Sequence, residues 1–177
     1  MITPTLADES EKLAKKLANP VASLISFRGG HNDICDASIP GEMLSIGNFQ
    51  AAFLEAMEML YSQNPPPMVV VSSLANVSEL YNAGMGNDWC EDIWATGEIC
   101  RVVTSGDTDY IAQADQRTRD YNDVLEYYAP IYGYTFVPET YLTEFTLDDL
   151  SDFDCFHPNV SGQNRIADII WENGLNY

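Results

Sequence analysis

The sequence is poor in basic residues and in histidine. It contains 8 Lys and Arg against 27 Asp and Glu, a net charge of −19, and only 2 histidines. Because phosphate binding needs clustered Lys and Arg, this balance argues against a nucleic-acid partner and against docking on anionic lipid surfaces. We interpret the acidity as a highly solvated surface.

Several familiar patterns are also missing. No apolar run approaches the roughly 18 residues of a membrane helix, so we expect a protein that is not integral to a membrane. No G-x-G-x-x-G follows a strand-like run, and no phosphate-binding P-loop is present. The sequence therefore gives no support to a nucleotide site.

What the chain does contain suits one globular domain. Its 177 residues, 46% of them hydrophobic, can bury a real core. Short apolar runs predict strands at 21–27, 68–71 and 130–137, and helical periodicity predicts helices over 5–18, 48–62, 107–128 and 162–173. We expect a short helix or turn at 75–81 and a loop over 84–97. This alternation predicts an α/β fold with three α/β/α layers and a parallel sheet.

The four cysteines are Cys35, Cys90, Cys100 and Cys155. An even number permits two disulfides with three connectivities, and the alternative is four buried thiols in a reducing cytoplasm. We favour disulfides, and with them an extracellular or periplasmic location, although the sequence shows no signal peptide. Cys90 and Cys100 flank a segment that reads as a short loop, so we expect them to pair with each other.

The pair Asp154 and His157 carries the first chemical signal. A carboxylate three residues before a histidine, on a tight loop, can hold one ring nitrogen and stabilise the imidazolium that forms during catalysis. The other ring nitrogen can then take a proton from a hydroxyl nucleophile. Alone this spacing is a weak signal, because a lone histidine is most often structural.

The second signal is the segment Gly30–Asp33, directly after the first predicted strand. Ligand sites in open α/β sheets lie at the carboxyl ends of strands. The Asn32 amide can donate a hydrogen bond to a developing oxyanion there, and Gly30 and His31 can line the substrate pocket. The alternative is an ordinary Gly-Asn turn.

Taken together, in this order, G-x-N-D and D-x-x-H resemble two signature blocks of the SGNH (GDSL-type) serine esterases and lipases, in particular the phospholipase B-like branch. That branch also has a cysteine after the N-D pair and another inside the D-C-F-H segment, as Cys35 and Cys155 stand here. The resemblance extends over essentially the whole chain. It implies a flavodoxin-like three-layer fold in which both segments converge, and therefore a Cys35–Cys155 disulfide.

The resemblance also implies roles for individual residues. His157 would be the general base, Asp154 would orient it, and Asn32 would donate to the oxyanion. Asp33 would shape the loop, and His31 departs from the small residue expected before Asn32. The implied activity is hydrolysis of carboxylic esters, on a small ester or lipid substrate, by a Ser-His-Asp mechanism that needs no metal or organic cofactor.

The family's G-D-S block, which carries the nucleophilic serine, has no counterpart in this sequence. In the nearest string, which begins at Ser105, Thr108 stands at the nucleophile's position, and the string fits a helix N-terminus better. Ser23 and Ser26 are not in a G-D-S context. We therefore expect a single SGNH hydrolase-like domain over 1–177 that is N-terminally incomplete and lacks its first strands. A homodimer or a missing N-terminal segment would then cover the open sheet edge.

Two alternatives to an ester hydrolase stay open. One is a catalytically inactive SGNH-like binding module or truncated remnant, in which Trp89 and Trp94 would stack on carbohydrate or on a partner. The other is an acidic metal-binding domain, which ranks last because its spacing lacks the Gly and Glu of an EF-hand loop. Its ligands would be Asp148, Asp149, Asp152 and Asp154.

Overall fold

A computed structural model describes residues 6, 12 and 23–175, and these contain a three-stranded parallel sheet. The strands are β1 (Leu24–Phe27), β2 (Met68–Ser72) and β3 (Thr135–Val137), in the order β1-β2-β3. In the register, Ile25 lies opposite Val69, and Val71 lies opposite Phe136. The predicted α/β class with a parallel sheet is therefore confirmed.

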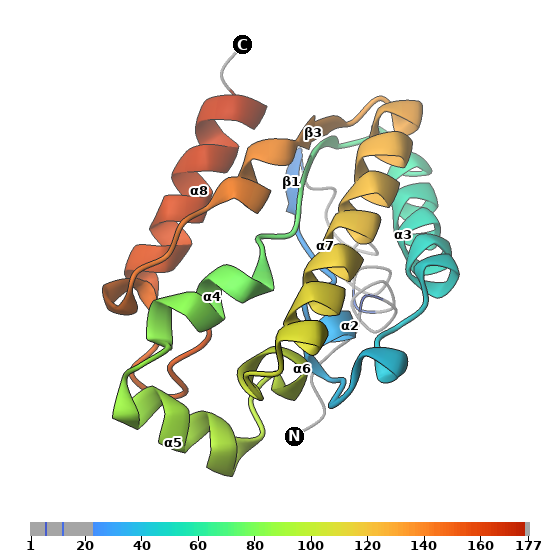
Figure 1. The fold of residues 1–177 in the computed structure, drawn as a ribbon. Helices are drawn as coiled ribbons and strands as arrows, with labels where there is room; N and C mark the ends of the chain where they lie inside the picture. Colours follow the sequence, from blue (N-terminus) through green and yellow to red (C-terminus); the bar gives the residue numbers. More distant parts are fainter. Residues whose placement is uncertain (1–5, 7–11, 13–22, 176–177) are drawn as a thin grey trace.

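Helices lie on both sides of this sheet (Figure 1). On one side, α3 (Ile46–Tyr61) and α7 (Thr108–Tyr128) pack together, and Phe49 stacks on Tyr121 with ring centroids 3.9 Å apart. On the other side, α8 (Val160–Gly174) approaches so closely that a Cβ at Gly174 would lie 2.6 Å from the Val70 side chain. This arrangement is compatible with three α/β/α layers.

Four shorter helices gather at the carboxyl end of the strands (Figure 1). They are α2 (Asn32–Cys35), α4 (Val77–Gly84), α5 (Asp88–Gly97) and α6 (Arg101–Thr104). Single 3-10 turns occupy Pro40–Glu42, Ala129–Tyr132, Pro138–Leu142 and Leu147–Asp149. Within the described part of the chain, no helix is both long enough and apolar enough to cross a membrane.

The long helices agree with the predictions to within three residues. The helix predicted over 48–62 begins at Ile46, because Ser45 caps it by accepting a hydrogen bond from the Asn48 amide at 3.2 Å. Asp107 caps α7 in the same way. The predicted helix over 5–18 lies outside the described residues except for Leu6 and Lys12, as do the first two residues of the strand predicted over 21–27.

Two predicted elements differ from the structure: one strand is shorter than expected, and one loop contains a helix. The strand expected over 130–137 is reduced to its last three residues. Pro130 lies instead in the 3-10 turn Ala129–Tyr132, and Gly133, whose φ is +76°, follows that turn. The loop expected over 84–97 contains the ten-residue helix α5. Asn87 caps this helix, and two acidic residues in its first turn suit the helix dipole.

The helix α5 also overturns the predicted disulfide pairing. The bridges are Cys35–Cys100 and Cys90–Cys155, not Cys90–Cys100 and Cys35–Cys155. A helix rises about 1.5 Å per residue, so Cys90 stands about 10 Å from the end of α5. A disulfide needs Cα atoms less than about 7 Å apart, so the helical form of α5 removes the short loop on which the expected Cys90–Cys100 pairing depended.

Candidate active site

The two signature segments meet at the carboxyl end of the sheet. Arg28, directly after β1, donates through Nη2 to Oε1 of Gln163 in the first turn of α8, at 3.2 Å. His31 lies close enough to both Arg28 and His157 for their positive charges to lower its pKa. Residues 126 positions apart in the chain, His31 and His157, therefore belong to one site.

Asp154 and His157 form a hydrogen-bonded pair. His157 Nδ1 lies 2.6 Å from Asp154 Oδ2, and Asp154 Oδ1 accepts the backbone N–H groups of Phe156 at 3.1 Å and His157 at 3.0 Å. An ionised carboxylate can only accept hydrogen bonds, so Nδ1 carries the proton in the neutral ring and Nε2 has the lone pair. No residue in the described ranges hydrogen-bonds to Nε2, and the His157 side chain is 60% exposed.

The two members of the pair shift each other's pKa in opposite directions. The hydrogen bond with Asp154 raises the pKa of His157 above its ordinary value, although burial acts against it. Partial burial would raise the pKa of Asp154, but the hydrogen bonds from the imidazole and from two backbone amides outweigh it and lower this pKa. Both effects favour the ionised pair. The arrangement stabilises an imidazolium at His157, as general-base catalysis requires.

The loop that carries this pair is fixed at several points. Cys155 has a left-handed backbone with φ of +54° and is bonded to Cys90 in α5. The indole N–H of Trp94 donates to the Cys155 carbonyl at 3.1 Å, and the Ser151 amide donates to the His157 carbonyl at 2.8 Å. The exposed imidazole therefore stands on a loop whose backbone is tied on both sides.

The segment Gly30–Asp33 is built into the interior instead. Gly30 is buried with φ of +121°, and a Cβ there would lie 2.6 Å from the Phe49 ring. Asp33 is also buried, and its Oδ2 accepts the Leu6 amide at 3.2 Å. Asn32 is half-buried and begins α2. The segment therefore presents Asn32 from a turn that is packed against the core.

His31 occupies a different environment from His157. Its ring is half-buried, and Nε2 lies 3.2 Å from the Ala75 carbonyl, to which it donates. Burial lowers the pKa of His31 to about 3, the charges on Arg28 and His157 act in the same direction, and the hydrogen bond to Ala75 opposes them. His31 is therefore neutral at ordinary pH, and it joins the turn before α2 to the segment after β2.

Two residues of this site were not singled out from the sequence. Arg28 is half-buried at the end of β1, and Gln163 joins it to the His157 loop, because Gln163 Nε2 donates to the Pro158 carbonyl at 3.4 Å. The position of Arg28 directly after a predicted strand was the available signal. Gln163 gave none, because a polar residue in the first turn of a helix is common.

The short helices α5 and α6 hold both segments. Cys100 stands at the N-cap of α6 and is bonded to Cys35 at the end of α2, while Cys90 in α5 is bonded to Cys155. A backbone hydrogen bond of 3.3 Å from Val102 to Ala37 adds to the first connection. One covalent unit, residues 88–104, therefore supports both the Asn32 turn and the His157 loop.

A nucleophile does not emerge from the described residues. No serine or threonine hydroxyl among them hydrogen-bonds to the His157 ring. Ser105, in the string nearest to G-D-S, ends α6, and its Oγ accepts the Asp107 amide at 3.4 Å as the chain enters α7. This agrees with the interpretation of that string as part of a helix N-terminus.

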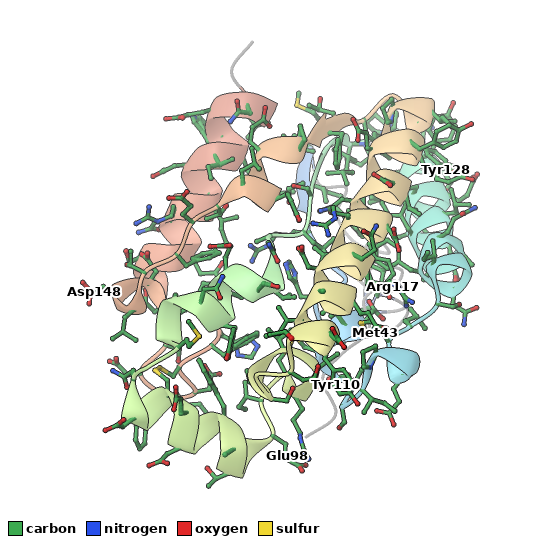
Figure 2. The ribbon with its side chains drawn as sticks, in the orientation of Figure 1. Met43, Glu98, Tyr110, Arg117, Tyr128 and Asp148 are labelled. Carbon is green, nitrogen blue, oxygen red and sulfur yellow. A yellow bond between two sulfur atoms is a disulfide. The ribbon has the colours of Figure 1, made fainter. Side chains whose placement is uncertain are left out.

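The other predicted features also take definite positions. Trp94 is 3% exposed and Trp89 is 57% exposed, so of these two tryptophans only Trp89 presents a stacking surface. No group of three or more metal-ligating side chains is gathered in the described part of the chain. Asp149 is buried and bonded to Thr146 and Ser161, whereas Asp148 lies at the outer rim of the molecule (Figure 2).

A separate cleft of about 530 Å³ lies between α4, α5 and α6. Trp94 lines it on one side and reaches the Cys155 carbonyl on the other. The cleft therefore lies behind the His157 loop rather than at the imidazole. Its lining residues are Tyr81, Glu91, Trp94, Ala95, Arg101, Thr104, Ser105 and Gly106.

Two comparisons with known proteins found no match to this chain. No protein-family model matches the chain, and a search of curated proteins gave no match. The assignment of a function therefore depends on the geometry of the site and on the two motifs.

Proposed function

We propose that this chain provides the base and oxyanion half of an SGNH-type carboxylic ester hydrolase. One observation carries the proposal: His157 Nδ1 lies 2.6 Å from Asp154 Oδ2, on an exposed loop beside the G-x-N-D turn. In this mechanism, Nε2 of His157 takes the proton of an attacking serine, and Asp154 stabilises the imidazolium. Asn32 donates to the oxyanion of the tetrahedral intermediate.

In this proposal, the attacking serine comes from a segment outside the two motifs. The order β1-β2-β3 supports this idea, because β1 is at an edge of the described sheet and its Leu24 side chain is 44% exposed. A further strand, for example from a second copy, would pair there. Light scattering tests the second copy: a strictly monomeric protein contradicts a homodimer.

The two disulfides are compatible with an oxidising compartment. We propose that the protein acts outside the cytoplasm, as an extracellular or periplasmic esterase or lipase on a small ester or lipid. The proposed reaction would need no metal or organic cofactor, because a serine, a histidine and a carboxylate together supply the nucleophile, the base and the charge stabilisation.

A fluorophosphonate probe tests the proposal directly. The protein is incubated with the probe, the labelled residue is located by mass spectrometry, and His157→Ala is compared with Phe153→Ala, a change at a more exposed position of the same loop. We expect labelling that His157→Ala abolishes and Phe153→Ala retains. Asn32→Ala should lower kcat about 10²–10³-fold with little change in KM. Labelling that survives His157→Ala contradicts the proposed base.

The alternative function is an inactive SGNH-like binding module. The observation that favours it is the lack of a described hydroxyl bonded to the His157 ring, together with the exposed Trp89. If the probe labels nothing and no ester is turned over, quenching of Trp89 fluorescence by oligosaccharides would support binding. The matched variant is Trp89→Ala, since the buried Trp94 reports on folding.

A further inference from the structure

The five arginines differ in the groups to which their guanidinium N–H groups donate. Three pair with carboxylates, at 2.7–3.2 Å: Arg101 with Glu98, Arg119 with Asp115, and Arg165 with Asp149. Arg117 donates to the carbonyls of Met43, which lies next to it in Figure 2, and of Leu44, and it lies over the Tyr121 ring. Arg28 differs from all four, because its hydrogen bond goes to the side-chain amide of Gln163.

The environment of Arg28 makes this unusual. The side chain is half-buried, and burial lowers the pKa of Arg28 below its ordinary value, yet a guanidinium stays protonated at any physiological pH. In a chain with 27 acidic residues, no described carboxylate lies within ion-pair distance of it. A partly desolvated charge that no carboxylate of the described residues neutralises is costly, which favours binding of an external anion.

The position of Arg28 places that anion at the candidate active site. Arg28 stands at the carboxyl end of β1, and Gln163 bridges it to the Pro158 carbonyl, next to His157. His31, which lies near both, has a pKa of about 3 and stays neutral, so it adds no competing charge. The charge of Arg28 therefore acts beside His31, and Gln163 joins it to the loop that carries His157.

We propose that Arg28, held by Gln163, is an anion-binding subsite that accepts a carboxylate or phosphate group. A guanidinium has five N–H donors in a planar fork that matches these oxyanions, and Gln163 uses one of them. The Gln163 amide is itself fixed by Pro158, so the fork is held in a set orientation. If ester hydrolysis is the activity, on which this last step rests, the preferred substrates are esters that carry a negative charge close to the scissile bond.

Binding of simple anions to the whole protein tests the subsite without any turnover. Inorganic phosphate and succinate are titrated at low ionic strength, by calorimetry and by the NMR signal of the Arg28 Nε–H group. We expect Arg28→Gln to weaken anion binding about tenfold or more, because a charge-assisted hydrogen bond is lost. The anion affinity of Arg28→Lys should lie between those of Arg28→Gln and the unmodified protein. Whichever probe binds more tightly identifies the anion as phosphate or carboxylate.

The matched control is Arg101→Gln, which removes an exposed arginine that lines the separate cleft. We expect its anion affinity to stay within about twofold of the unmodified protein. Three results would overturn the subsite: no anion binding by the unmodified protein, equal affinity in Arg28→Gln, or an equal loss in Arg101→Gln. A circular dichroism spectrum of Arg28→Gln that matches those of Arg28→Lys and the unmodified protein excludes misfolding as the cause of weaker anion binding.

Kinetics then separate the subsite from the proposed function. Two p-nitrophenyl esters are compared, the neutral acetate and the negatively charged mono-succinate. We expect Arg28→Gln to raise KM for the succinate ester about tenfold more than it raises KM for the acetate ester. If neither ester is hydrolysed, the anion titration still decides the subsite, and the ester hydrolase alone is contradicted.

Discussion

The two histidines of this chain show how position alone assigns different chemistry to the same side chain. His31 is half-buried, donates to a backbone carbonyl and has a pKa of about 3. His157 is exposed, is bonded to a carboxylate and has a raised pKa. The first is a neutral structural donor and the second is suited to accept a proton. A histidine count from sequence does not separate these roles, whereas the groups around each ring do.

The largest expected effect concerns the covalent support of the two segments. Both disulfides join residues 65 positions apart, so replacing either pair by alanine should cost about 4 kcal/mol of unfolding free energy in the chain-entropy account. Loss of Cys90–Cys155 should also return the pKa of His157 toward its ordinary value, because the loop is released. Urea unfolding and NMR titration measure both effects. Equal His157 pKa values in the two double variants would contradict the separate tethering of the His157 loop.

The next largest effect on the free energy of unfolding should come from a substitution in the interior segment Gly30–Asp33. Gly30→Ala should lower the unfolding free energy by about 2–4 kcal/mol, because φ is +121° and the new Cβ would lie 2.6 Å from Phe49. Phe49 cannot yield, since it is fully buried against Tyr121. Gly47→Ala, in α3 with nothing within 4 Å, is the control and should stabilise by about 0.5 kcal/mol or more. Thermal or urea unfolding decides between them.

A smaller effect should appear in the dependence of stability on pH. The pKa of His31 is about 3 in the folded state and about 6.5 when unfolded, so the unfolded chain binds more protons between these values. His31 therefore reduces stability as pH falls from about 6.5 toward 3. His31→Gln retains a donor for the Ala75 carbonyl and should flatten this part of the stability curve. An unchanged slope, measured by urea unfolding from pH 7 to 4, would contradict the low pKa.

The smallest effect is local to the exposed histidine. Asp154→Asn should lower the pKa of His157, because the hydrogen bond and charge that raise it are lost. The control Asp148→Asn, at the rim of the molecule, should leave this pKa unchanged. The pair also contributes to the free energy of unfolding. The contribution of His157 is present below about pH 6.5 and is lost as pH rises through its raised pKa. The contribution of Asp154 is lost as pH falls through its lowered pKa. Histidine NMR signals followed across pH measure the shift.

The periodic elements were predictable because their signals are local. Helix α7 has an apolar side and an Asp107 cap, and β2 is a continuous apolar run, so both can be placed from sequence. The helix α5 was missed because its Gly and Trp residues suggested a loop, although Asn87 and two early acidic residues are the helix signals. That one error also produced the wrong disulfide pairing.

The chemistry of the site was only partly predictable. The spacing of Asp154 and His157 predicted their contact, since three residues on a tight loop allow little else. The contact between Arg28 and Gln163 could not be predicted, because it joins residues 135 positions apart through long flexible side chains. The buried state of Trp94 was equally hidden, since its partner is a backbone carbonyl in another segment.

The order of the cysteines along the chain gives the two disulfides an interlocked topology. Cys90 lies before Cys100, so the closed loops 35–100 and 90–155 overlap across the stretch that contains most of α5. A protease that cuts this stretch leaves Cys35 and Cys90 on one fragment and Cys100 and Cys155 on the other. Both bonds then join the fragments, so the nicked protein keeps the Asn32 turn and the His157 loop in a single covalent particle until a reductant separates them.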